Sequence, residues 1–141
     1  MTGYLVDTNI ISESLRPQPD ANVAAWMEST EDALKYLSVA TIGEIQKGID
    51  LLADSARKER LHLWVRLDLR IQMGARILPI TAEIAEMWGT LSARRQREGR
   101  PLSVVDGYLG ATALVHGLTV VTRNTRDFEG LGVSVLNPFE A

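Results

Sequence analysis

Short apolar runs alternate along the chain with longer amphipathic stretches. The apolar runs are too short for helices and are typical of buried strands, which we predict at residues 3–6, 36–39, 76–79, 118–121 and 132–136. Apolar side chains that recur every three or four residues predict helices at 20–29, 41–53, 55–73, 81–97 and 103–116. Strands that alternate with helices favour a three-layer α/β/α sandwich around a mainly parallel sheet of roughly five strands.

The chain has 141 residues, which is an ordinary length for one domain. No linker or repeat divides it, so we expect a single domain over residues 1–141. Hydrophobic residues make up 45% and charged residues 23%, which is a globular composition rather than a disordered one. The sequence has no cysteine, which excludes disulfides, thiolate nucleophiles and cysteine-ligated zinc or iron–sulfur sites.

We expect no membrane span and no export signal. The longest apolar runs fall well short of the roughly 18 residues that a membrane-spanning helix needs. Residues 1–9 lack the basic start and the long apolar core of a secretory signal. These patterns, together with the absence of cysteine, predict a cytoplasmic protein.

Polar side chains follow three of the predicted strands. Asp7 ends the first strand directly, Glu44 and Asp106 lie in the first turns of predicted helices, and Asn124 and Asp127 follow the strand at 118–121. In open parallel sheets, ligands bind outside the carboxyl ends of the strands. We therefore expect several of these side chains to gather at one edge of the sheet.

Helix capping is the simpler explanation for each acid alone. Asp7 could be a helix N-cap, while Thr41-x-x-Glu44 and Ser103-x-x-Asp106 match the capping-box pattern. As a group, however, clustered carboxylates repel one another unless a cation neutralises them. Oxygen ligands without a cluster of His or Cys favour Mg²⁺ or Mn²⁺, and such ions assist attack on a phosphorus centre.

Four motifs occur in order along the chain. They are Val-Asp-Thr-Asn-Ile-Ile-Ser-Glu at 6–13, Thr-x-x-Glu at 41–44, Asp-Gly-Tyr-x-x-Ala-Thr-Ala at 106–113 and Val-Thr-Arg-Asn-x-x-Asp-Phe at 121–128. Together they resemble the PIN domain, and more narrowly the VapC/FitB group of bacterial toxin ribonucleases. Residues 7–19 and the ending Asn137-Pro138-Phe139 resemble the FitB subgroup.

The resemblance implies a function, a cofactor and partners. It implies a PIN-like fold and an endoribonuclease that depends on Mg²⁺ or Mn²⁺ and cleaves RNA by means of a metal-activated water. It also implies a bacterial toxin–antitoxin pair and a toxin homodimer. The antitoxin would be small, with a DNA-binding N-terminus and a C-terminal segment that lies across the acidic groove of the toxin.

The resemblance also implies roles for individual residues. Asp7, Glu44 and Asp106 match three of the family's catalytic, metal-binding acids. The fourth acid often lies where this chain has Asn124, and here the carboxylate comes three residues later, at Asp127. If 124–127 is one helical turn, both side chains share a face, so Asn124 could ligate the metal or hold its water while Asp127 supplies charge.

Other polar residues near these acids are candidates for binding and positioning. Thr8 and Asn9 could position Asp7 or a metal-bound water, and Arg123 could hold the scissile phosphate. A basic cluster is either a solvated helix end or a contact for phosphate or antitoxin, and it comprises Arg94, Arg95, Arg97 and Arg100.

Two alternative functions stay open. A PIN-like module that regulates or scaffolds without catalysis is favoured by Asn124 at the fourth acidic position. A phosphatase of the haloacid dehalogenase type also places an aspartate after its first strand, but it needs a second aspartate where this chain has Asn9.

The acidic excess of the chain fits a nuclease once the candidate site is set aside. The chain has 18 acidic and 15 basic residues, and its net charge of −3 excludes a strongly basic coating protein. Without Asp7, Glu44, Asp106 and Asp127 the count is 14 against 15, a balance of +1. The composition therefore does not exclude an enzyme that cuts RNA.

Overall fold

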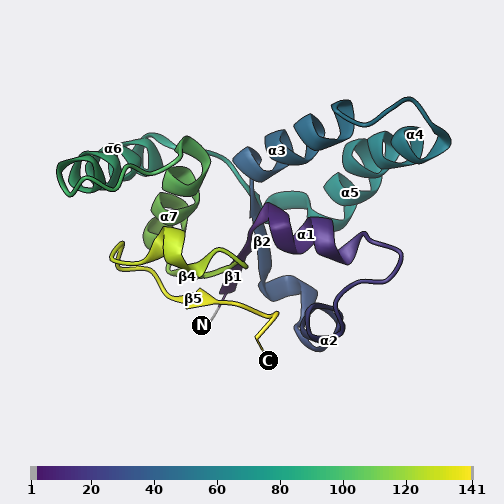
Figure 1. The fold of residues 1–141 in the computed structure, drawn as a ribbon, viewed down its shortest axis with the longest axis horizontal. Coiled ribbons are helices and arrows are strands. Elements are labelled where there is room, and N and C mark those ends of the chain that lie inside the picture. Colours follow the sequence, from purple (N-terminus) through teal and green to yellow (C-terminus); the bar gives the residue numbers. More distant parts are fainter. Residues whose placement is uncertain (1–2, 141) are drawn as a thin grey trace.

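The computed structural model describes residues 3–140. Within them, five strands form one sheet in the order β3-β2-β1-β4-β5, and every pairing is parallel (Figure 1). The strands are β1 Gly3–Val6, β2 Lys35–Ser38, β3 Ile77–Leu78, β4 Leu118–Val121 and β5 Val135–Leu136. The predicted parallel sheet is confirmed. Met1 and Thr2, which belong to the segment expected to lack a secretory signal, and Ala141 lie outside the described residues.

Helices connect the strands on both faces of the sheet. They are α1 Thr8–Ser14, α2 Ala21–Ser29, α3 Val39–Asp50, α4 Ala56–Leu63, α5 Leu69–Met73, α6 Ala82–Arg97 and α7 Val104–His116. Short 3₁₀ turns lie at Asp32–Leu34, Gly74–Arg76 and Thr125–Phe128. Within residues 3–140, no helix has both the length and the apolar character to cross a membrane.

The sheet separates two hydrophobic cores. Successive side chains of a strand point to opposite faces, so Leu5 and Val6 enter different cores, as do Val120 and Val121. One core packs the sheet against α6 and α7, and the other packs it against α1, α2, α3 and α5. Figure 1 shows these two groups of helices on either side of the sheet. The predicted three-layer sandwich is confirmed.

The start of α3 differs from the sequence-based expectation. The N-cap is Ser38, whose hydroxyl accepts a hydrogen bond from the backbone N–H of Ala40 at 3.0 Å. Thr41 therefore lies inside the helix, where it is buried and its hydroxyl has no hydrogen-bond partner among the described residues. The prediction of a capping box at Thr41 is wrong, because a serine three residues upstream caps the helix first. The cap at Ser103 is confirmed, since its hydroxyl accepts from the N–H of Asp106 at 3.2 Å.

The long helix predicted at 55–73 is interrupted by a π-helical segment. Ser55 caps α4, and α4 is separated from α5 by the π turns of Trp64–Asp68. Val65 and Leu69 are both buried, so the apolar periodicity continues through the interruption and does not reveal it. The predicted end of this helix at residue 73 is confirmed, because Gly74 follows it with a φ of 53°, a conformation that glycine adopts without steric cost.

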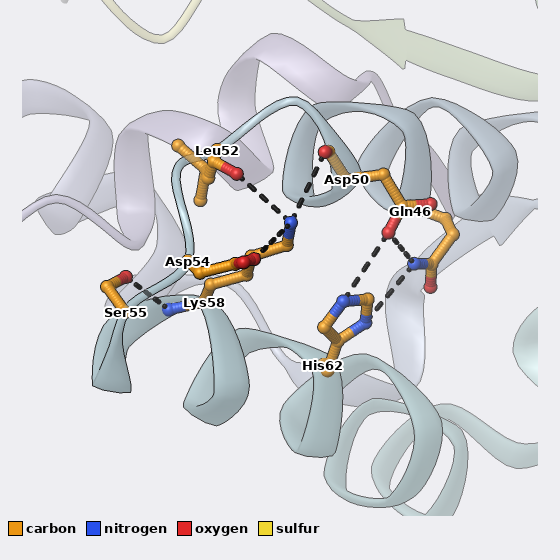
Figure 2. Close-up of polar contacts among 7 residues, drawn as sticks. All are labelled: Gln46, Asp50, Leu52, Asp54, Ser55, Lys58 and His62. Carbon is orange, nitrogen blue, oxygen red and sulfur yellow. Dashed lines mark hydrogen bonds and ion pairs between the residues drawn. The ribbon is translucent and has the colours of Figure 1, made fainter.

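The connection between α3 and α4 is fixed by polar contacts (Figure 2). The Lys58 ammonium donates to the backbone carbonyls of Asp50 at 3.4 Å and Leu52 at 3.0 Å, and pairs with the Asp54 carboxylate at 3.3 Å. His62 lies 3.4 Å from the Asp50 carboxylate. These contacts hold the carboxyl end of α3, the helix that carries Glu44 nearer its start.

Candidate active site

An open pocket of about 560 Å³ lies at the carboxyl end of β1. It is lined by Asp7, Thr8, Asn9, Ser12, Glu13, Arg16, Glu44, Asp106 and Asn124. The structure thus brings together most of the side chains that the sequence picks out. Asp127 and Arg123 are not among the residues that line it.

Asp7 is the most firmly held acid of the pocket. Its backbone N–H continues the sheet by donating to the carbonyl of Val121 at 2.9 Å, and its carboxylate caps α1 by accepting from the N–H of Thr8 at 2.7 Å. The same carboxylate accepts from the side chains of Asn9 at 3.2 Å and Thr122 at 2.8 Å. The capping explanation is therefore correct, and it coexists with a position inside the pocket.

Burial makes Asp7 a weak acid. The residue is only 5% exposed, and burial raises the pKa of its carboxyl to about 6. The negative charges of Asp106 and Glu44 raise this pKa further, while the hydrogen bonds from Thr122 and Thr8 lower it. The pocket thus concentrates negative charge, which makes the Asp7 carboxyl harder to ionise.

Thr122 is a site residue that the sequence analysis missed. It is fully buried at the end of β4, and its hydroxyl donates to Asp7 while accepting from the Asn9 amide at 3.2 Å and from the backbone N–H of Asn124 at 3.0 Å. Because Val6 pairs with Val121, the next residues along each strand come side by side. Thr122 comes directly after the apolar strand β4, just as Asp7 comes directly after β1. This shared position is the sequence pattern that could have identified Thr122 as a site residue.

Thr8 and Asn9 act on different partners. The Thr8 hydroxyl donates to the Glu44 carboxylate at 2.5 Å, so it orients the acid of α3. Asn9 donates to Asp7, and its side-chain oxygen accepts from the backbone N–H of Arg123 at 3.1 Å. These two residues link the acids to the backbone of α1 and to the segment after β4.

Asp106 is half-buried in the first turn of α7. Burial raises the pKa of its carboxyl, as do the charges of Asp127 and Glu44, whereas a hydrogen bond with Ser103 and the charge of Arg95 lower it. The neighbouring Gly107 packs against α6 so closely that an added Cβ would lie 2.8 Å from the Trp88 ring. Close helix packing therefore fixes the place of Asp106.

Asn124 and Asp127 are placed differently from each other. The segment between them is a 3₁₀ turn rather than an α-helical one, and Asn124 precedes it with a non-helical backbone (φ −92°, ψ 60°). Of the two, only Asn124 lines the pocket. Asp127 is exposed, and its negative charge raises the pKa of Asp106.

Two arginines named by the sequence analysis have other partners. The Arg95 guanidinium is 5% exposed and donates to the backbone carbonyls of Arg100 at 2.9 Å and of Asp127 and Glu129, both at 3.3 Å. For Arg95, the expectation of a solvated helix end or of a phosphate contact is wrong. The Arg123 guanidinium lies 4.7 Å from the centre of the Phe139 ring.

The donors around the pocket fit a hydrated divalent ion. The carboxylates of Asp7, Glu44 and Asp106 line the pocket, and hard ions such as Mg²⁺ prefer oxygen ligands. Within residues 3–140, no three side chains of His, Cys, Asp or Glu stand close enough to enclose an ion. Mg²⁺ commonly keeps several waters and takes only one or two carboxylates, so an open pocket suits it better than a closed cage.

Comparisons with known proteins agree with this architecture. The family model of the PIN domain matches residues 4–133. The chain is 38% identical over 135 residues to "Toxin FitB" of Neisseria gonorrhoeae, covering 96% of this chain and 97% of FitB. It is 35% identical over 138 residues to "VapC ribonuclease Y4jK" of Sinorhizobium fredii, covering 96% and 97% of the two chains.

A solved structure shows the same fold. The crystal structure of FitAcB from Neisseria gonorrhoeae contains a chain that superposes with a TM-score of 0.91 at 37% identity, covering 98% of this chain and 99% of that one. The family match spans most of the sequence, and the relatives align over nearly their whole length. The chain therefore belongs to the PIN domain family, within its FitB/VapC group of toxins.

Proposed function

We propose that this protein is an endoribonuclease toxin that cleaves RNA phosphodiester bonds with the help of Mg²⁺ or Mn²⁺. The observation that carries the proposal is the gathering of Asp7, Glu44 and Asp106 around one open pocket, where burial and, to a smaller extent, mutual repulsion raise the pKa values of the two aspartates. Such a site gains stability when a cation binds. The relative named a VapC ribonuclease supports the choice of reaction.

The ion, when bound, supplies positive charge that acidifies a water and offsets charge on the phosphate. Asp7, Glu44 and Asp106 would hold it. The contacts of Asp7 with Thr8, Asn9 and Thr122 keep its carboxylate fixed before any ligand arrives. Thr8 holds the Glu44 carboxylate, and the Asn124 amide, a neutral oxygen donor, would orient a water or a phosphate oxygen.

The proposed partners are RNA, an antitoxin and a second copy of the chain. The relative named as a toxin, together with the similar chain in the structure of FitAB bound to a DNA fragment, supports a small DNA-binding antitoxin as the inhibitor. A homodimer is supported by exposed apolar side chains from the end of α4 through the π-helical segment to α5, where Leu63 is 59%, Leu67 53% and Ile71 80% exposed. A cytoplasmic location stays a prediction.

The test is RNA cleavage by the protein purified free of antitoxin. We expect single-stranded RNA to be cut with Mg²⁺ or Mn²⁺, and cleavage to stop in EDTA. Asp7→Asn and Asp106→Asn should each lower kcat by at least about a hundredfold, because each removes a carboxylate that holds the ion. Arg66→Gln, on the exposed side of the π-helical segment, is the control that keeps full activity.

Cleavage that persists in EDTA, or in both aspartate variants, would contradict the mechanism. A regulatory module without catalysis is the second candidate, favoured by the neutral Asn124 in the pocket. It predicts that the protein binds its partner but cuts no RNA with either ion. The phosphatase alternative has no second acid, since Asn9 occupies that position and its amide donates to Asp7.

A further inference from the structure

Among the described residues that line the acidic pocket, Arg16 is the only one with a positively charged side chain. The pocket otherwise presents neutral polar groups and the carboxylates of Asp7, Glu13, Glu44 and Asp106. An RNA phosphodiester is an anion, so these carboxylates repel it. A cation at the pocket wall would offset part of that repulsion.

Arg16 is restrained by a buried acid. Glu13 is 8% exposed, and its Oε1 accepts from the Arg16 Nη1 at 3.2 Å. Its Oε2 accepts from the backbone N–H of Asp20 at 2.9 Å, and the Asp20 side chain in turn caps α2. Glu13 is thus fixed by a second partner, and it holds the guanidinium beside the pocket.

The guanidinium of Arg16 keeps donors free for a ligand. Its side chain is 64% exposed, and its Nε and Nη2 make no hydrogen bond with any residue between 3 and 140. A guanidinium presents several N–H groups in a planar fork, which matches the oxygens of a phosphate. The ion pair with Glu13 therefore occupies Nη1 alone, and the N–H groups of Nε and Nη2 can still donate to a ligand.

Two other arginines near the site, Arg95 and Arg123, do not supply this charge. Arg95 is buried against backbone carbonyls, and Arg123 lies over the Phe139 ring. Neither side chain lines the pocket.

We propose that Arg16 binds a phosphodiester group of the RNA at the mouth of the acidic pocket, with Glu13 as its positioning residue. The inference rests on the proposed ribonuclease function and adds the contact for substrate that the carboxylates cannot provide. It also separates two tasks within one pocket, because the carboxylates hold the ion while Arg16 holds the anion.

The first experiment measures binding of a single-stranded RNA oligonucleotide across a NaCl series, in an Asp106→Asn background that prevents cleavage. Removing one phosphate contact lowers the slope of log affinity against log salt by about 0.7 for a single strand. We expect this change in Arg16→Gln but not in Arg16→Lys, which keeps the charge. Arg66→Gln removes an exposed arginine away from the pocket, and it should leave the slope unchanged.

The second experiment measures cleavage kinetics in the active protein. Arg16→Gln should raise KM about tenfold and change kcat less than about twofold, since the contact forms equally with bound substrate and transition state. Glu13→Gln tests whether Glu13 acts by positioning Arg16 or only by its own negative charge. Loss of a negative charge alone would lower KM, whereas loss of the restraint on Arg16 raises it.

Each outcome decides the inference. A raised KM in Glu13→Gln together with a reduced salt slope in Arg16→Gln supports it. Equal behaviour of Arg16→Gln and Arg66→Gln, or a lower KM in Glu13→Gln, overturns it while the proposed function stands. A protein that neither binds nor cuts RNA overturns the proposed function as well.

Discussion

Asp7 and Asp106 line the same pocket, yet the chain holds them in opposite ways. The Asp7 carboxylate is buried and accepts hydrogen bonds from Thr8, Asn9 and Thr122, the last of which lies 115 residues away in sequence. Asp106 is half-buried and depends on the N-cap of its own helix, Ser103. The Asp7 carboxylate is thus held by a hydrogen bond from a distant segment, whereas Asp106 has a local partner and only its helix is placed by packing on α6.

The two aspartates depend on different sources of stability. Burial raises the pKa of Asp7, and the hydrogen bonds from Thr122 and Thr8 lower it in part. Asp106 is less buried, and its position follows from the start of α7. Changes around Asp7 should therefore affect folding and function together, while changes around Asp106 should leave the fold largely intact.

The largest expected effect is a pH dependence of stability that comes from Asp7. Its pKa in the folded protein is about 6, above the ordinary value of 3.8 that we expect in the unfolded chain. Between these values the folded state binds more protons, so the free energy of unfolding falls as pH rises. The stabilising contribution is complete below pH 3.8 and is lost as pH passes through about 6.

Two pKa units correspond to about 3 kcal/mol. Urea titrations of the metal-free protein at a series of pH values would measure this slope, and Asp7→Asn should flatten it. Asp106→Asn should flatten it less, because that side chain is less buried. Equal slopes in the wild type and Asp7→Asn would show that Asp7 is not the weak acid that its burial implies.

The second prediction compares one support of each aspartate. Thr122→Val keeps the shape of the side chain but removes the hydroxyl that Asp7, Asn9 and Asn124 share, so it should cost about 2–3 kcal/mol. Ser103→Ala removes only a helix cap and should cost about 1 kcal/mol. Chemical denaturation at pH 7 measures both values. Equal costs would mean that the two aspartates are held equally.

The smallest effects should come from the segment after β4. Asn124→Asp adds a carboxylate to the pocket and should tighten binding of Mg²⁺ or Mn²⁺ about three- to tenfold. Asp127→Ala removes an exposed charge outside the pocket, so metal affinity should change less than about threefold and stability by less than about 0.5 kcal/mol. Isothermal titration calorimetry gives both affinities. A larger loss in Asp127→Ala would assign Asp127 to the metal.

The sequence predicts the layers well because they depend on apolar patterning. The bounds predicted for β4, residues 118–121, coincide with the structure, since a continuous apolar run suits a strand buried on both faces. The edge strands β3 and β5 are each two residues long and lie inside longer predicted runs, because only pairing with a neighbour sets their length. The periodicity does not predict α1, a helix of seven residues with a mixed face.

The site residues also fall into those that the sequence pattern predicts and those that depend on tertiary structure. Asp7, Glu44, Asp106 and Asn124 were expected at one sheet edge because parallel strands share a direction, and all four line the pocket. Thr122 was missed because its importance comes from the register of β1 against β4, which no local pattern carries. Glu13 and Arg16 were missed because they resemble ordinary surface charges until burial distinguishes Glu13.

The central position of β1 has a consequence for how the protein is made. β1 lies between β2 and β4 in the sheet. Because β4 comes much later in the sequence, β1 can pair on both sides only after β4 has been synthesised. The bond between Asp7 and Thr122 spans 115 residues, which the ribosome adds in on the order of ten seconds. Until these residues have been added the acidic pocket is unfinished, so the proposed activity cannot begin before β4 and Thr122 have been made.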